Sequence, residues 1–293
     1  MKGFKRQTEG SCVCVFCNQL ISVDNPICPQ CNRKNPSLWG YSRSLRRLGA
    51  DLGFTKIVIW GCVALYLATL LIDFSNIHSS GLFDLLSPSN LSLVLFGASG
   101  AIPVFELGRW WTVLSAGWLH GSLLHILFNL LWINQFAPQV AQAFGSGRLV
   151  IIYTTAIVVG SLLSSIAGQV FLGIPILQGA QVTIGASGGL FGLLGALVAY
   201  GQITGKFSVK HQALTYVLIM FLFGFIMPNV DNWAHFGGFL GGYLVSILGG
   251  MDPRRAESLR HLFLAIACLA LTIISILASI LHGLLWLTQQ FSS

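Results

Sequence analysis

Apolar residues dominate the chain from about residue 55 onward, where they form long blocks separated by short polar breaks. About twenty apolar residues in helical conformation cross the hydrocarbon layer of a bilayer. The sequence shows no alternating apolar and polar pattern of the kind that builds a transmembrane barrel. The blocks therefore predict an all-α polytopic membrane protein, with spans near residues 55–74, 120–137, 149–172, 185–203, 211–227, 232–249 and 261–287.

The composition agrees with this class. Hydrophobic residues make up 54% of the 293 residues, and charged residues make up only 9%. Soluble globular domains carry about a quarter charged residues. A chain this apolar would expose a large apolar surface to water, which excludes an ordinary soluble protein and makes the bilayer its natural solvent.

Positive charge is distributed unevenly along the chain. Nine of the 16 Lys and Arg residues lie between Lys2 and Lys56, with no apolar stretch of a signal peptide before Ile57. If the N-terminus is cytoplasmic, the cytoplasmic segments hold fifteen of the 16, and only Arg109 lies outside. The net charge of +7 is then typical of an anionic membrane face rather than of a nucleic-acid partner. The sequence predicts an integral protein of a bacterial inner membrane, with a cytoplasmic N-terminus and an external C-terminus.

The block that begins near residue 120 carries polar residues that lipid would not tolerate. It contains His120, His125 and Asn129, and the last two are four residues apart and share one helix face. Histidine and asparagine at membrane depth need a partner or a water-filled cavity. This block therefore predicts a site rather than a lipid-facing helix.

Two later blocks are rich in glycine and contain one polar residue each of chemical interest. Ser187 follows a polar, glycine-rich break over residues 178–183 and opens a short span. Irregular backbone at this depth predicts a helix that starts inside the membrane and lines a cavity. His235 lies about one turn into a span whose following residues are rich in glycine.

Each block also has a purely structural interpretation. A serine in a membrane helix usually bonds to its own backbone, a histidine near a span end is usually interfacial, and glycine-rich faces usually allow close helix packing. That interpretation does not explain why Ser187, His235, His125 and Asn129 all fall near the outward ends of their spans. Close packing would also bring Ser187 and His235 within hydrogen-bond reach. This pair supplies the nucleophile and the base that acyl transfer requires.

Together the blocks resemble the motifs of the rhomboid family of intramembrane serine proteases, in the expected order and on the expected spans. The motif residues are His120, His125 and Asn129, then Gly185, Ser187 and Gly188, then His235, Gly238 and Gly242. The resemblance covers roughly residues 55–250. It implies a six-helix core over residues 53–250 around a water-filled cavity open to the outer face. Residues 251–293 then form a basic linker and an extra, seventh transmembrane helix.

The resemblance also implies roles, which the chemistry of the residues supports. Ser187 Oγ attacks the scissile carbonyl, and His235 takes the serine proton and returns it to the leaving amine. A helix N-terminus favours developing negative charge, and the resemblance assigns His125 and Asn129, with the Ser187 amide, to the oxyanion site. The supporting residues are Phe191, which the family places against the catalytic imidazole, and His120, Gly185, Gly188, Gly238 and Gly242.

Asp231, four residues before His235, has two interpretations. It could be the third member of a catalytic triad. It could instead cap the helix that carries His235, a role for which Asn232 competes.

The loop over residues 75–119 departs from the family pattern in one place. The family often carries a Trp-Arg pair in this loop. Here Trp111 fits, but Thr112 stands at the arginine position, and Arg109 is a nearby candidate substitute. The resemblance predicts that this loop lies partly embedded in the outer leaflet.

Residues 1–52 form a polar head with five of the seven cysteines. Cys14, Cys17, Cys28 and Cys31 form two knuckles whose spacing is typical of a tetrahedral structural zinc site. A disulfide or redox pair and inert thiols are the alternatives, although a cytoplasmic head is in a reducing compartment. Cys12 could compete as a ligand. A closed four-cysteine site has no open position for catalysis, so the zinc-ribbon-like head is expected to dock a cytoplasmic protein partner or to regulate.

The predicted function is hydrolysis of peptide bonds in or near the transmembrane segments of membrane proteins. A transporter or channel should show inverted repeats with paired broken helices, and the sequence shows none. A catalytically inactive rhomboid-like protein that binds membrane clients should have lost Ser187 or His235, and both are present. The expected partners are transmembrane substrates and lipids, not nucleic acid.

Overall fold

The computed structural model describes residues 5–15, 17, 19–32, 34–46, 49–174, 177–227, 230–255 and 257–291. The head contains β1 (Ser11–Val13), β2 (Leu20–Ser22) and α1 (Ser42–Arg46). The long helices are α2 (Phe54–Ile72), α5 (Leu123–Phe144), α6 (Ser146–Val170), α7 (Ser187–Thr204), α8 (Phe207–Ile226), α9 (Asn232–Leu248) and α10 (Leu259–Phe291). Five short elements lie between α2 and α5: η1 (Phe74–Asn76), α3 (Asn90–Phe96), η2 (Ile102–Glu106), α4 (Thr112–Ser115) and η3 (Ala116–Trp118).

All seven predicted spans are helices. Within the described ranges, α2, α6, α7, α8 and the Leu259–Leu285 part of α10 are each long and apolar enough to cross a membrane. A sixth candidate span is α5 together with residues 112–118, which are bent by 93° relative to α5. The 17-residue α9 packs along α6 and α7. The chain is therefore a helical integral membrane protein with a small N-terminal head.

Glycine allows α7 and α9 to lie with their backbones in contact. A Cβ atom added to Gly238 of α9 would overlap the Gly188 carbonyl oxygen of α7. A Cβ added to Gly242 would overlap the Gly192 carbonyl oxygen in the same way. Small residues permit such close approach between membrane helices. The spacing of these glycines thus sets how near the starts of the two helices come to each other.

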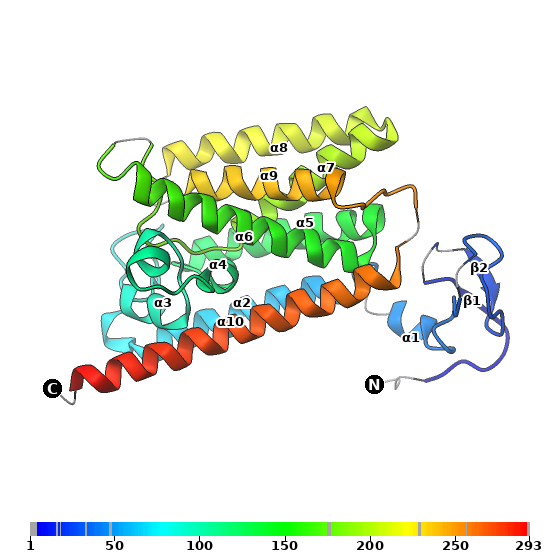
Figure 1. Cartoon of the computed structure of the whole chain (residues 1–293), viewed down its shortest axis with the longest axis horizontal. Coiled ribbons are helices and arrows are strands. Elements are labelled where there is room, and N and C mark those ends of the chain that lie inside the picture. Colours follow the sequence, from blue (N-terminus) through cyan, green and yellow to red (C-terminus); the bar gives the residue numbers. More distant parts are fainter. Residues whose placement is uncertain are drawn as a thin grey trace.

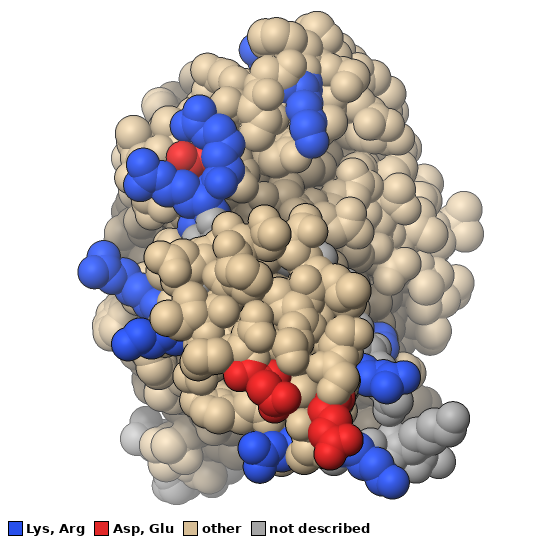
Figure 2. Space-filling view, turned by 90° about the vertical axis from the view of Figure 1, so that its right-hand side faces the viewer, with Lys and Arg blue, Asp and Glu red and all other residues tan. Residues whose placement is uncertain are grey.

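The head lies beyond one end of the helical bundle, and α3 and α4 lie at the other end (Figure 1). In the head, strands β1 and β2 pair antiparallel, with Ser11 opposite Ser22. Viewed from the head end, Lys and Arg side chains gather on the molecule with few acidic ones (Figure 2). Chain order explains this arrangement, since the α7–α8 and α9–α10 connections that carry basic residues return to the end where α2 begins.

The segment between α2 and α5 exposes several large apolar side chains. Phe105, Leu107 and Trp110 are all exposed, and Trp110 is 70% exposed. Aromatic and apolar residues of this kind suit a membrane interface. The embedding of this loop in the outer leaflet stays a prediction.

Candidate active site

Ser187 is the first residue of α7, and an unusual backbone turn precedes it. Gly185 has φ +122°, a conformation that strongly favours glycine. A Cβ at Gly185 would lie 2.8 Å from His125 Nε2 and 3.6 Å from Ser187 Oγ. The Gly185 amide also donates to the Ala116 carbonyl at 2.9 Å. Gly185 therefore lies beside both the serine hydroxyl and the His125 ring.

His235 reaches the same region from α9. Its ring stacks on the ring of Phe191, with centroids 4.2 Å apart and planes at 13°. Phe191 lies one turn after Ser187 on α7, so His235 packs against the first turns of the helix that Ser187 begins. His235 is only 7% exposed, which shields the imidazole from solvent and lipid. The stacking predicted for Phe191 is present.

Ser187 and His235 lie in the first turns of α7 and α9, whose backbones are in contact, but no hydrogen bond is formed between their side chains. Among the hydrogen bonds of the described residues, none joins Ser187 Oγ to the imidazole, and His235 Nδ1 has no partner. Catalytic hydrogen bonds are often long in unliganded enzymes and tighten when substrate binds. The arrangement therefore juxtaposes a nucleophile and a base, and their catalytic role stays a prediction.

His125 presents its Nε2 atom to Gly185, two residues before Ser187. The Gly121 amide donates to His125 Nδ1 at 3.3 Å. Because Nδ1 accepts in this bond, the neutral ring carries its hydrogen on Nε2, the atom nearest to Gly185. A hydrogen-bond donor at this point suits an oxyanion site.

Asn129 lies one turn further along α5 and is 4% exposed. Its Nδ2 donates to the His125 backbone carbonyl at 2.9 Å. Asn129 therefore steadies the helix that carries His125, and its donation to an oxyanion stays a prediction. His120 is fully buried and packs edge-to-face on His125, with ring centroids 5.1 Å apart.

Asp231 caps α9, which resolves the two interpretations of this residue in favour of the cap. Its Oδ1 accepts from the Ala234 amide at 3.0 Å, and Asn232 is already helical. Its Oδ2 accepts from Ser164 Oγ at 2.5 Å and from Thr183 Oγ1 at 2.5 Å. The carboxylate thereby ties the His235 helix to α6 and to the segment that leads into Ser187.

Ser164 and Thr183 were missed by sequence reasoning. Thr183 falls in the polar break before Ser187, which gave a weak signal. Ser164 looks like an ordinary helix serine in the sequence, and only its contact with Asp231 reveals its role.

Arg109, the candidate substitute for the loop arginine, is buried between the segment that precedes α5 and helix α10. It is 2% exposed, and its guanidinium donates to the carbonyls of Val94 at 2.8 Å and Ser279 at 3.1 Å. Thr112, at the position of the family's arginine, is fully buried and donates its hydroxyl to the Arg109 carbonyl at 2.7 Å. Arg109 and Thr112 therefore both form hydrogen bonds that stabilise this loop.

The head brings its four predicted cysteine ligands together. Their sulfur atoms all lie within 4.8 Å of one another, with 3.8 Å between Cys14 and Cys31 and 3.6 Å between Cys17 and Cys28. Thiolates bound at 2.3 Å to a tetrahedral zinc ion stand about 3.8 Å apart, whereas disulfide sulfurs are about 2.05 Å apart. The four residues therefore fit a metal ion and not a disulfide.

Two further features of the head agree with metal binding. Burial raises the pKa of the Cys28 thiol, but hydrogen bonds from the backbone of Cys31 and Gln30 outweigh burial and lower this pKa to about 7. A thiolate is the form that binds a metal. Cys12, the competing ligand, is buried in the small apolar cluster of the head and lies outside the group of four.

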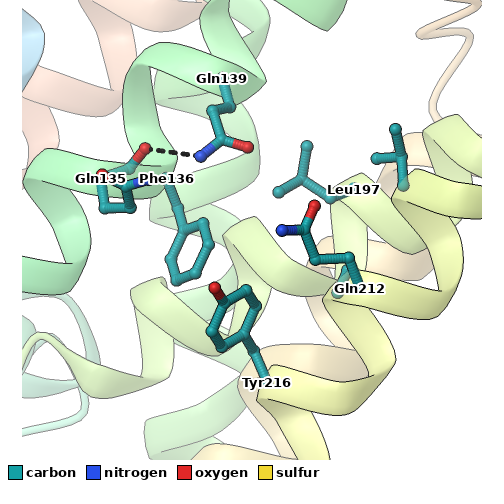
Figure 3. Close-up of a pocket in the computed structure, with 8 residues that line it drawn as sticks. Gln135, Phe136, Gln139, Leu197, Gln212 and Tyr216 are labelled. Atoms are coloured by element: carbon teal, nitrogen blue, oxygen red, sulfur yellow. Dashed lines mark hydrogen bonds between the residues drawn. The ribbon is translucent and has the colours of Figure 1, made fainter.

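A separate polar pocket of about 30 Å³ lies between α5, α7 and α8. Figure 3 shows Gln135, Gln139 and Gln212 around it, beside Phe136 and Tyr216. Its α7 residue, Leu197, is ten residues after Ser187, which is about 15 Å along a helix. A volume of this size holds about one water molecule, so the pocket is not the catalytic centre.

Comparison with known proteins identifies the central part of the chain. Residues 107–252 match the family model for the Rhomboid domain. This range contains every predicted site residue of the membrane body and leaves out the head and α10.

Several curated proteins are similar to this chain. Rhomboid protease GluP of Bacillus subtilis (strain 168) is 32% identical over 190 residues, which cover 64% of this chain and 35% of GluP. RHOMBOID-like protein 5 of Arabidopsis thaliana is 34% identical over 177 residues, covering 58% of this chain and 53% of that protein. RHOMBOID-like protein 1 of the same plant is 33% identical over 175 residues, covering 58% and 42%. The chain thus spans about half or less of the length of these relatives.

Proposed function

Because the chain belongs to the rhomboid family, whose members are generally intramembrane serine proteases, we propose that it cleaves other membrane proteins. The reaction is hydrolysis of a peptide bond in or near a transmembrane segment of the substrate. Ser187 is the nucleophile and His235 is the base.

The stacking of His235 on Phe191 is the observation that carries this proposal. A base must be held where it can reach the nucleophile's proton. Here a buried aromatic ring one turn from Ser187 fixes the plane of the imidazole, while Asp231 fixes the start of its helix. In a Ser-His-Asp triad a carboxylate orients the imidazole, whereas in this dyad packing against Phe191 orients the His235 ring.

The reaction proceeds in two halves. His235 accepts the Ser187 hydroxyl proton as Oγ attacks the carbonyl carbon, and the proton then passes to the leaving amine as the peptide bond breaks. Water next attacks the acyl-serine ester, giving its proton to His235. The ester bond breaks, the proton returns to Ser187 Oγ, and the second product leaves as a carboxylic acid.

Developing negative charge on the carbonyl oxygen is stabilised at the start of α7. The first amides of a helix have no partner within the helix, and the Ser187 amide is one of them. His125 Nε2 and the Asn129 side chain supply further donors, and preorganised donors of this kind are worth about 100- to 1,000-fold in rate each.

A catalytically inactive relative that binds membrane clients is the second candidate. It would keep the rhomboid domain and its transmembrane partners but would not need the reacting side chains. The presence of both Ser187 and His235, together with Gly185 and Phe191 around them, favours the protease.

We further propose that the four cysteines of the head hold one structural zinc ion and that the head binds a cytoplasmic protein partner. The clustering of Lys and Arg at the head end supports a cytoplasmic N-terminus and an active site that opens to the outer face. The bacterial origin predicted from the sequence has no such support, since the relatives come from a plant and a bacterium.

Labelling with a mechanism-based serine-hydrolase probe tests the proposal. The detergent-solubilised protein should form one covalent adduct, at Ser187, and should cleave a model transmembrane substrate. Ser187→Ala should lose both activities. Ser246→Ala is the matched control, because Ser246 is a buried α9 serine whose hydroxyl bonds only to its own helix at Gly242. Labelling that persists in Ser187→Ala, or a native protein that neither labels nor cleaves, would contradict the proposal.

A further inference from the structure

The C-terminal helix α10 presents small and polar residues to the rest of the protein. Ala265, Thr272, Ser275 and Ser279 are 6%, 4%, 2% and 0% exposed, and they recur every three, four or seven residues. Large apolar residues occupy the other faces of the helix and are exposed, as a lipid-facing surface requires: Leu264, Ile266, Leu271, Ile273, Ile274, Leu277 and Leu281. The helix packs against α6 and, further along, against α3 and α4, which lie at the end of the bundle away from the head (Figure 1).

Three hydrogen bonds join the buried face of α10 to the loop between α2 and α5. Arg109 donates to the Ser279 carbonyl at 3.1 Å, and Trp111 Nε1 donates to Ser279 Oγ at 3.1 Å. In return, Ser275 Oγ donates to the Trp111 carbonyl at 2.7 Å. A buried arginine in a membrane protein is costly unless its donors are satisfied, and Arg109 uses both terminal nitrogens in this way while its Nε has no partner among the described residues. A helix that merely adds hydrophobic length would not need these contacts.

The same loop is bonded on its other side to the segment that leads into Ser187. Ser99 and Thr183 exchange two backbone hydrogen bonds, at 3.0 Å and 2.8 Å. The Gly185 amide donates to the carbonyl of Ala116, the first residue of η3, which directly follows α4. The loop is thus bonded to α10 on one side and to the nucleophile's approach segment on the other.

The start of α10 is anchored as well. The Glu257 carboxylate, two residues before α10, accepts from the Arg148 amide at 2.6 Å in the first turn of α6. A carboxylate at a helix N-terminus is favourable both for the free amides and for the helix dipole. Arg148 in turn donates to the carbonyls of Asp252 and Arg255 in the α9–α10 linker, at 3.0 Å each. The helix is therefore fixed to the core just before its start and again at Ser275 and Ser279, through the segment between α2 and α5.

We propose that α10 is a working part of the catalytic unit, in which Arg109, Ser275 and Ser279 are positioning residues for Ser187. They act through the segment between α2 and α5. Helix α10 holds residues 109–111 of this segment, and the segment in turn holds residues 183–185, which set the position of Ser187. This inference rests on the proposed function and assigns a role to a helix outside the matched Rhomboid domain.

The test compares Arg109→Gln and the double variant Ser275→Ala with Ser279→Ala against a matched control. Thr272→Val is that control, because Thr272 lies on the same buried face but bonds only to Cys268 of its own helix. Cleavage is measured per active molecule in detergent, alongside the rate at which the serine probe labels Ser187 and the melting temperature. The Arg109 variant and the α10 double variant, together called the loop variants, should each lower kcat by about 100-fold, with KM within about threefold. This is the cost of displacing a reacting group by on the order of 1 Å. The control should change neither.

Arg109→Lys supplies a graded variant, because lysine keeps the charge and one donor but not the fork that reaches two carbonyls. It should recover part of the lost kcat. Variants that melt at a lower temperature but keep kcat per folded molecule would overturn the proposal and leave α10 with a purely stabilising role.

An activity-free measurement separates this inference from the proposed function. Hydrogen exchange at residues 97–112 and 183–185 should become faster in the loop variants and stay unchanged in Thr272→Val. If native protein never labels at Ser187, the proposed function fails while this exchange pattern still tests the connection. If the protein is active but exchange at residues 183–185 is unchanged in both loop variants, the connection itself is wrong.

Discussion

The head and the membrane body of this protein are held together by different means. The head has a two-stranded hairpin and a small apolar cluster composed largely of cysteines and two aliphatic residues, Ile21 and Val23. So little apolar surface cannot stabilise a fold without an added crosslink or metal. The membrane body instead depends on backbone contact between helices and on polar groups satisfied inside the bundle.

Because of this difference, a change in the head and a change in the membrane body should affect folding and cleavage differently. Loss of the metal should unfold the head alone, because nothing in the α7–α9 contact uses it. A methyl group added between α7 and α9 should disturb the membrane body and the site together, because the contact between these helices also positions Ser187 and His235. The following variants break or sharpen this contrast, in order of decreasing effect on cleavage.

The largest effect is expected from the reacting pair. His235→Ala should lower cleavage of a model membrane substrate by at least about 1,000-fold, and the double variant with Ser187→Ala should be no worse, because the two residues act as one unit. The melting temperature in detergent should stay close to that of the native protein. Substantial turnover by His235→Ala would eliminate this residue as the base.

Gly238→Ala tests the helix contact on which the pair depends. The added methyl group would overlap the Gly188 carbonyl oxygen, and such overpacking costs about 1–3 kcal/mol of stability. Thermal unfolding should therefore shift downward, with a clear loss of cleavage. Gly81→Ala is the control, since a Cβ there meets nothing within 4 Å. Equal effects of the two substitutions would mean that the α7–α9 contact is looser than described.

Asn129→Ala probes the proposed oxyanion donors. Turnover should fall by about ten- to a thousand-fold, the scale of losing one preorganised donor, while KM changes little. Asn134→Ala, an exposed substitution on the same helix, is the comparison. A variant that binds substrate poorly but turns it over normally would show that Asn129 serves only to steady His125 through its bond to the backbone.

The smallest effect on cleavage is expected from the head. Metal analysis of protein purified without chelator should give one zinc ion per chain, and Cys28→Ser with Cys31→Ser should remove it. Cleavage of a simple model substrate should change by no more than about twofold, because the head lies beyond one end of the helical bundle (Figure 1), away from the α7–α9 contact, and a hydrocarbon layer is about 30 Å thick. Cleavage of the native substrate is expected to fall if the head recruits it.

Two results would contradict this expectation. Protein without zinc would refute the assignment of the metal. A folded protein that lacks residues 1–40 and no longer cleaves the model substrate would show that the head controls the membrane body.

Much of the site could be predicted from the sequence because its signals are local. The membrane class follows from apolar block length, and the helical state of all seven blocks is confirmed. Histidine, asparagine and serine inside apolar blocks identify themselves by their cost in lipid. The cysteine spacing likewise predicted a cluster, which the structure contains.

Only the tertiary structure decided how these pieces are connected. Asp231 caps α9 through a local contact with Ala234, but its bond to Ser164 spans 67 positions of the sequence and exists only because α6 and α9 pack together. The stand-in for the loop arginine depended on a contact between Arg109 and Ser279 across 170 positions. Hydrophobicity and spacing specify which residues must be buried, since they act on each residue and its near neighbours. They do not specify which buried donor meets which acceptor, because that pairing depends on how distant helices pack, and in this protein it bonds α10 to the segment between α2 and α5.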